Sequence, residues 1–163
     1  MQSAGLQDSG SSTEDALAAL FGADSFVRQQ TPDGTPTLWV DADRLIDVLK
    51  SLQPDYPMLY DLFGIDERLR EHRPPAAADF TVVYHLMNFE GPEEIRIKTS
   101  VSTDDINVPS AVNIWPNANW YERETWDMFG VEFTGHPNLR RLILPPTWEG
   151  HALRKDHPAR ATE

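Results

Sequence analysis

The sequence of 163 residues contains no cysteine and no long apolar run. Without cysteine, the chain cannot form a disulfide, ligate an iron–sulfur cluster or zinc ion through thiolates, or use a cysteine nucleophile. The longest uncharged apolar run, residues 16–21, is far shorter than the roughly 20 residues that a spanning helix needs. Residues 1–12 lack the basic start and apolar middle of a signal peptide, so we expect them to form a flexible polar leader.

Basic residues are scarce, and the formal net charge is −12. From residue 136 onward, five Lys or Arg face three Asp or Glu, which leaves nine basic and 23 acidic residues in the rest of the chain. Such an acidic body argues against binding to nucleic acid, which requires a basic face, and against unaided docking on anionic lipid. The basic carboxyl end is a separate feature.

Alternating and apolar segments predict an antiparallel sheet. Segments 26–30 and 37–40 flank a Pro-Asp-Gly turn and predict a hairpin. Segments 80–89 and 95–101 predict a second hairpin, because the latter alternates apolar and polar residues along its length. Segment 58–66 predicts a further strand, with Gly64 as a candidate bulge. Segment 68–75 is rich in arginine and predicts an exposed loop.

Helical signals occur before and after these strands. Ser11 and Glu14 have capping-box spacing ahead of a helix that ends at Gly22. Asp41 is expected to cap a helix over 41–53. Two more helices are expected over 110–115 and 118–129, the second with Asn117 as its cap and Gly130 as its end. The predicted fold is an α+β domain over residues 13–135, a mainly antiparallel sheet with helices packed on one side.

Residues 136–163 are expected to form an extended, proline-rich arm that docks on a neighbouring subunit. Four prolines in this stretch prevent a long helix or a central strand. Large apolar residues alternate there with arginines, so the arm needs a surface to lie on. That surface is either its own domain or another chain.

Two adjoining stretches carry a family resemblance. The first is Glu-Arg-Glu-Thr-Trp-Asp-Met-Phe-Gly at 122–130, followed by Gly-His-Pro-Asn-Leu-Arg-Arg at 135–141. The second is Trp-Glu-Gly-His at 148–151, then Leu-Arg-Lys-Asp at 153–156. Together they resemble the signature of the C subunit of proton-pumping NADH:quinone oxidoreductase, respiratory complex I. The flanks 116–121 and 158–163 resemble the bacterial form in which the C and D subunits are fused. Ala152 and His157 depart from the family pattern, which commonly has a proline and an aromatic residue there.

The resemblance implies a scaffold protein of the hydrophilic arm, peripheral on the cytoplasmic side of the bacterial inner membrane. It implies the D subunit, fused or separate, and the B subunit as partners, and contact with the membrane only through the complex. It also implies that FMN, the iron–sulfur clusters and the quinone site belong to partner subunits, with no cofactor, metal or catalytic residue on this chain. Related proteins serve membrane-bound hydrogenases and a ferredoxin-driven complex, which remain an alternative assignment.

A stand-alone hydrolase that uses Glu124 and Asp127 is a further alternative, because the two residues share a helical face. However, Arg123 has the spacing to pair with Asp127, and the sequence shows no nucleophile elbow, P-loop or dinucleotide-binding fingerprint. His136, His151 and His157 match no common zinc spacing. We expect the Gly-His-Pro stretch to form a turn in which the His136 imidazole bonds a carbonyl or a carboxylate.

The favoured hypothesis is a partner interface centred on the signature. Arginine suits carboxylates at interfaces, and tryptophan supplies buried anchors. The predicted interface residues are Glu122, Arg123, Glu124, Asp127, His136, Arg140, Arg141, Trp148, His151, Arg154, Lys155 and Asp156. Arg140, Arg141, Arg154 and Lys155 have the competing interpretation of a merely solvated charged surface.

Overall fold

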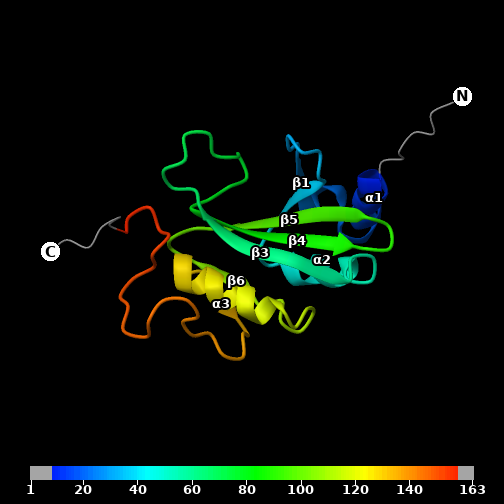
Figure 1. Ribbon diagram of the computed structural model, residues 1–163. Helices are drawn as coiled ribbons and strands as arrows, with labels where there is room; N and C mark the ends of the chain where they lie inside the picture. The colour runs from blue at the N-terminus through cyan, green and yellow to red at the C-terminus, as the bar shows by residue number, and fades with distance from the viewer. Residues whose placement is uncertain (1–8, 158–163) are drawn as a thin grey trace, which may run out of the picture.

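The computed structural model describes residues 9–157, and only the backbone of 9–12 (Figure 1). A five-stranded sheet has the order β1-β2-β5-β4-β3. Strands β1 (Phe26–Gln29) and β2 (Thr37–Val40) form the predicted antiparallel hairpin. Strands β3 (Met58–Asp66), β4 (Phe80–Asn88) and β5 (Glu93–Val101) pair antiparallel in sequence order. The predicted sheet is thus confirmed, and a parallel pairing of β2 with β5 joins its two parts.

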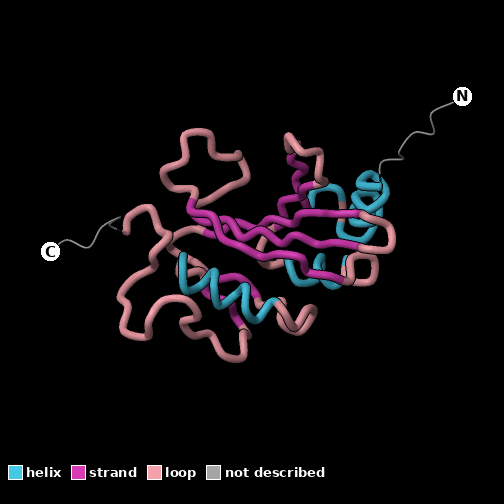
Figure 2. Tube along the Cα trace, in the orientation of Figure 1, coloured by secondary structure: helices cyan, strands magenta, loops and turns pink. Residues whose placement is uncertain are grey.

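One face of the sheet forms the core with the helices α1 (Ser9–Phe21), α2 (Leu45–Leu52) and α3 (Ala118–Phe129). In β5, the apolar residues and Thr99 are buried, whereas Arg96, Lys98 and Ser100 are half-buried, as the alternation predicts. Leu17 of α1, Leu49 of α2 and Ala118 of α3 all join this cluster. Figure 2 shows α3 running below the strands, beside the β3 edge.

The helices match the predictions better at their ends than at their starts. Helix α3 ends at Gly130 as predicted, with φ +77° and a hydrogen bond from Gly130 N to Trp126 O. Asn117 occupies the predicted cap position, but its amide donates to Leu59 O instead of capping the helix. Helix α2 begins at Leu45, not Asp41, because Asp41 O accepts from Arg44 N in a separate turn. Helix α1 already begins at Ser9, so residues 9–12 of the predicted leader are helical, and Ser11 is no cap.

The predicted helix over 110–115 is wrong. A single turn is present there, in which Ile114 N and Trp115 N donate to Ala111 O, and Pro116 has no N–H group with which to continue it. Just before it, β6 (Asn107–Pro109) pairs in parallel with β7 (Glu132–Thr134), and no sequence pattern indicates either strand. Strands of three residues are too short to show an alternating pattern.

The predicted bulge at Gly64 is also wrong, because the register shift lies between Leu59 and Asp61. Gly64 has another function in the fold. A Cβ atom at this position would lie 2.7 Å from the ring of Phe129, so the missing side chain lets α3 approach the edge of the sheet.

Residues 136–157, called the C-terminal segment below, contain turns and bends but no helix or strand. The segment does not extend away from the domain but folds back along α3 (Figure 1, orange to red). Residues 158–163 of the predicted arm lie outside the described residues, as do residues 1–8 of the predicted leader. Between residues 9 and 157, no helix has the length and apolarity needed to cross a membrane.

Candidate functional site

Asp127, on the buried side of α3, is the centre of the contacts that hold the C-terminal segment. Its Oδ2 accepts hydrogen bonds from the backbone N–H groups of Leu142, Ile143 and Leu144, at 3.0, 2.8 and 2.9 Å. Its Oδ1 accepts from the guanidinium of Arg141 at 2.7 Å. Burial acts to raise the pKa of Asp127, but the bonds from Arg141 and the backbone outweigh it and hold that pKa below its ordinary value.

Two arginines, Arg141 of the segment and Arg123 of α3, donate hydrogen bonds to backbone carbonyls of the segment. Arg141 donates to the carbonyls of Trp148 and Gly150 at 2.8 and 2.9 Å, which closes the turn between them. Arg123 donates to Arg140 O and Arg141 O at 3.2 and 3.1 Å, which joins α3 to the segment. Planar guanidinium groups suit this work, since each presents several N–H donors in a fixed geometry.

Asp66, at the end of β3, forms a second attachment point. It accepts from Lys155 N at 2.8 Å and from the Arg68 guanidinium at 2.6 Å, and Arg68 also bonds Asp156. Burial raises the pKa of Asp66, but the hydrogen bonds from Arg68 and Lys155 outweigh this and lower it to about 2. Sequence reasoning missed Asp66 and Arg68, because 88 residues separate Arg68 from Asp156 and no local pattern links them.

The end of α3 makes the remaining attachments. Leu153 N donates to Met128 O at 3.0 Å, and Arg154 Nε donates to Phe129 O. A Cβ atom at Gly130 would lie 2.6 Å from the ring of His151, so glycine there permits both the left-handed turn and the close approach of the segment. The last turn of the helix therefore obtains its missing hydrogen-bond partners from residues far along the chain.

The three histidines lie in the C-terminal segment, and two of them bond carbonyls of α3. His136 Nδ1 accepts from Asn138 N at 3.0 Å, so its Nε2 carries the proton and donates to Asn119 O, as the sequence predicts for a turn residue. His151 Nδ1 donates to Asp127 O, and burial lowers the pKa of this imidazole. His157 stacks on Trp148 with ring centroids 5.7 Å apart. The described residues hold no group of three or more side chains suited to a metal ion.

The acidic residues of the signature lie in different environments. Glu122 is fully buried and accepts from Ser110 Oγ and Ala111 N, both at 2.6 Å, and burial raises its pKa to about 7. Glu124 faces solvent. Asp127 is buried and occupied by four hydrogen bonds, whereas Glu124 is exposed, so this arrangement does not favour the acid–base pair of the hydrolase alternative.

The predicted interface residues therefore fall into two groups. Seven have side chains that bind the protein itself: Glu122, Arg123, Asp127, His136, Arg141, His151 and Arg154. Five remain exposed: Glu124, Arg140, Trp148, Lys155 and Asp156, of which Asp156 also pairs with Arg68. Within the first group, Glu122 holds the turn after β6 and the other six hold the segment. The second group lies on the surface of α3 and the segment.

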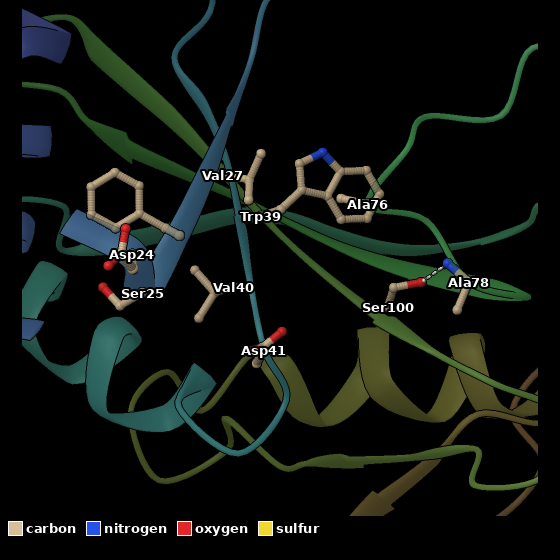
Figure 3. Close-up of a pocket in the computed structure, with 10 residues that line it drawn as sticks. Asp24, Ser25, Val27, Trp39, Val40, Asp41, Ala76, Ala78 and Ser100 are labelled. Atoms are coloured by element: carbon tan, nitrogen blue, oxygen red, sulfur yellow. Dashed lines mark hydrogen bonds between the residues drawn. The ribbon is translucent and has the colours of Figure 1, made fainter. Parts of the chain in front are cut away.

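A pocket of about 200 Å³ lies between the 3-10 turn η1 (Ala23–Ser25) and strands β1 and β2 (Figure 3). Ser25 donates to Gly22 O at 2.6 Å, and Ser100 donates to Phe80 O at 3.0 Å. Trp39 covers one wall, and Asp24 and Asp41 also line the pocket. Because both hydroxyls are bonded to carbonyls and no histidine lines this pocket, it lacks an activated nucleophile.

The chain is similar in sequence to known proteins. The chain is 57% identical over 151 residues to the fused C/D subunit of the NADH-quinone oxidoreductase of Pseudomonas aeruginosa, an alignment that covers 90% of this chain and 26% of that protein. It is 56% identical over 147 residues to the corresponding C/D protein of Cronobacter sakazakii, covering 88% and 24%. The chain thus spans about a quarter of the length of these relatives.

Two solved structures share the fold. A trypsin-resistant fragment (1–134) of Nqo5 matches 78% of this chain and 99% of its own length, with a TM-score of 0.68 and 22% identity. A chain of the membrane-bound sulfane sulfur reductase, an archaeal respiratory membrane complex, matches 79% and 72%, with a TM-score of 0.62 and 24% identity. The sequence profile described as respiratory-chain NADH dehydrogenase, 30 Kd subunit, matches residues 38–163, and the chain belongs to that family.

Proposed function

We propose that the protein is an assembly subunit in the hydrophilic arm of a proton-translocating NADH:quinone oxidoreductase. In this role it supports electron transfer from NADH to a membrane quinone by positioning partner subunits. FMN, iron–sulfur clusters and quinone are held by those partners, and no redox cofactor is bound by this chain. The observation that carries the proposal is the family match over residues 38–163.

The proposed partners are the D subunit and the B subunit, on the cytoplasmic side of the bacterial inner membrane. Fusion of C with D in the relatives supports the first partner. The exposed apolar side chains of the C-terminal segment support docking through that segment: Ile143 is 58% exposed and Trp148 is 40% exposed. Arg140, also exposed in this segment, supplies a donor for a carboxylate or a carbonyl of the partner.

The internal hydrogen bonds of the segment favour such docking. Asp127 and Asp66 fix the backbone of the segment before a partner arrives, so less conformational entropy is lost on association. The seven inward-facing signature residues therefore act on the partner only through the shape of the protein itself, six of them through the shape of the segment. The five exposed ones are proposed to contact it directly.

Purification of the complex tests this proposal. The gene carrying an affinity tag replaces the natural copy, the membranes are solubilised, and the tagged material is assayed for flavin, iron and NADH:quinone reductase activity. We expect all three to copurify with the tagged protein, and expect the purified chain alone to be colourless and inert toward NADH. A tagged chain that brings down no flavin- or iron-containing protein contradicts the proposal. Recovery with hydrogenase-type subunits supports the alternative complex instead, which the shared fold of the sulfane sulfur reductase makes worth testing.

A pair of variants tests the surface. Ile143→Ser with Trp148→Ala removes two of the three exposed large apolar side chains of the segment, and we expect recovery of the partner subunits to fall at least tenfold. Leu20→Ser is the matched control, because Leu20 is 67% exposed on α1. Equal recovery of partners by the two proteins contradicts docking through the segment.

A further inference from the structure

A groove of about 250 Å³ on the surface of the protein is lined by residues of β3, α3 and the C-terminal segment. Its floor is apolar and formed by Leu62, Thr125 and Met128, each less than one-tenth exposed. Phe63 of β3 and Leu153 of the C-terminal segment line it and are 41% and 54% exposed. Exposed apolar side chains gathered around one hollow indicate a surface that another molecule covers.

Two carboxylates line the same groove, Asp61 from β3 and Glu124 from α3. Within residues 9–157, neither has a hydrogen bond or an ion pair from its side chain. Asp66 and Asp127, on the same two elements, are each bonded to an arginine and to backbone N–H groups. The protein therefore neutralises the carboxylates that hold its own segment and leaves those of the groove without a cation.

In the described part of the chain, the outer edge of β3 has hydrogen-bond partners at its start but not beside the groove. β3 is the last strand of the sheet. At its start, the carbonyls of Pro57, Leu59 and Tyr60 accept hydrogen bonds from side chains just before or within α3. Over 61–65, beside the groove, the described chain makes no hydrogen bond to the outer edge of the strand. A strand edge without hydrogen-bond partners offers its backbone groups to an added strand.

We propose that this β3–α3 groove binds an extended segment of a partner polypeptide in which Lys or Arg lies next to large apolar side chains. The cation meets Asp61 and Glu124, and an apolar side chain inserts between Phe63 and Leu153. The backbone of the segment pairs with the free edge of β3. The inference rests on the proposed function, because the partner is another subunit of the same complex.

The negative charge of the protein distinguishes between candidate ligands of the β3–α3 groove. Residues 1–135 carry nine basic and 23 acidic side chains, so the body of a second copy, like an anionic ligand, is repelled from the two carboxylates. A basic and apolar peptide segment satisfies the carboxylates and the apolar floor together. It also provides the backbone groups that the strand edge lacks.

Site-specific cross-linking in the assembled complex tests the inference. Phe63 is replaced by the photoreactive p-benzoylphenylalanine in the tagged chain, the complex is purified and irradiated, and the linked peptide is identified by mass spectrometry. We expect one major product, in a segment of another subunit that contains Lys or Arg beside large apolar residues. The same amino acid at Leu20, exposed on α1, is the control and is expected not to reach that segment.

Charge-reversal variants complete the experiment. Asp61→Lys with Glu124→Lys is expected to reduce the cross-link yield at least tenfold. The matched control, Glu90→Lys with Asp104→Lys, reverses two exposed acidic side chains outside the groove and leaves the yield unchanged. If the photoreactive side chain at Phe63 prevents folding, the same probe at Leu153 serves in its place.

Each outcome bears on one claim. A product within residues 1–163, in a second copy, or in an acidic segment overturns the inference, as does the absence of any product in a complex that has assembled. In all these cases, copurification of the tagged chain with the flavin and iron proteins leaves the proposed function intact. Failure of the unmodified tagged chain to copurify removes the proposed function itself.

Discussion

The sheet body and the C-terminal segment are held together by different forces. In the body, fully buried apolar side chains such as Leu38, Leu86 and Ile97 supply most of the stabilisation. In the segment, the large side chains Ile143, Trp148 and Leu153 are exposed, and the chain is held by carboxylates and guanidinium groups bonded to backbone atoms. The difference shows that a loop without a core of its own can still be held in one conformation. It is held when buried charged side chains form hydrogen bonds with its N–H and C=O groups.

The carboxyl groups of the two regions also respond oppositely to pH. Glu122 joins α3 to the turn after β6 inside the body, and burial raises its pKa to about 7. Asp127 and Asp66 hold the segment, and despite burial their hydrogen bonds lower their pKa values. Acid is therefore expected to release the segment first, whereas a rise of pH through about 7 weakens the body.

Asp127→Ala gives the largest expected effect. The change removes the acceptor of four hydrogen bonds and leaves Arg141 without its anion, which costs about 3–5 kcal/mol for a buried pair. We expect protease to cut within 136–157 while the sheet body stays folded, measured by limited proteolysis and circular dichroism. Glu124→Gln, three residues earlier and exposed, is the matched control. Loss of the body together with the segment would break the comparison, because the two regions would then unfold as one unit.

Glu122→Gln tests the pH dependence of the stability of the sheet body. The pKa of Glu122 is higher in the folded protein than the ordinary 4.5, so its contribution to stability is complete below about pH 4.5 and is lost as pH rises through about 7. We expect the unfolding free energy of the wild type to fall by about 1–3 kcal/mol over this range and that of the variant to fall much less. Urea titrations at several pH values measure this difference. Parallel curves for the two proteins would contradict it.

Asp66→Asn tests the opposite pH dependence of the segment. Because the pKa of Asp66 falls from 3.8 to about 2, its contribution is present above about pH 4 and is lost as pH falls through about 2. We expect a loss of about 2 kcal/mol over that window in the wild type and a flatter profile in the variant. Hydrogen exchange of Lys155 N, which donates to Asp66, reports the release. Protection of Lys155 N that stays constant down to pH 2 would contradict the assignment.

Asp156→Asn is expected to have the smallest effect. Asp156 pairs with Arg68, but its side chain is 61% exposed, and exposed ion pairs contribute about 0–1 kcal/mol. The unfolding midpoint in urea should move little, and 1 M salt should remove what remains of the difference from the wild type. A loss as large as that expected for Asp66→Asn would show that the outer pair, not the buried one, holds this end of the segment.

The interface prediction shows where sequence reasoning reaches its limit. The signature residues are predicted to contact a partner, and this stays a prediction, but Arg123, Asp127 and Arg141 also bind the protein itself. From the sequence alone, an arginine that donates to carbonyls of its own chain looks the same as one that waits for another protein. The partners of Asp127 lie 14 to 17 residues away in a stretch without regular structure, where no periodicity predicts the distances.

The sequence alone determined the elements whose pattern is local. The alternation of β5 and the interval from Asn117 to Gly130 require no distant contact, so these patterns place β5 and α3 correctly. Only the tertiary structure decided the parallel pairing of β2 with β5, the short pair β6–β7, the bulge after Leu59 and the folding back of the C-terminal segment. The physical reason is that hydrogen bonds within a helix or hairpin join near neighbours, whereas each of these features depends on groups brought together by the packing of the whole chain.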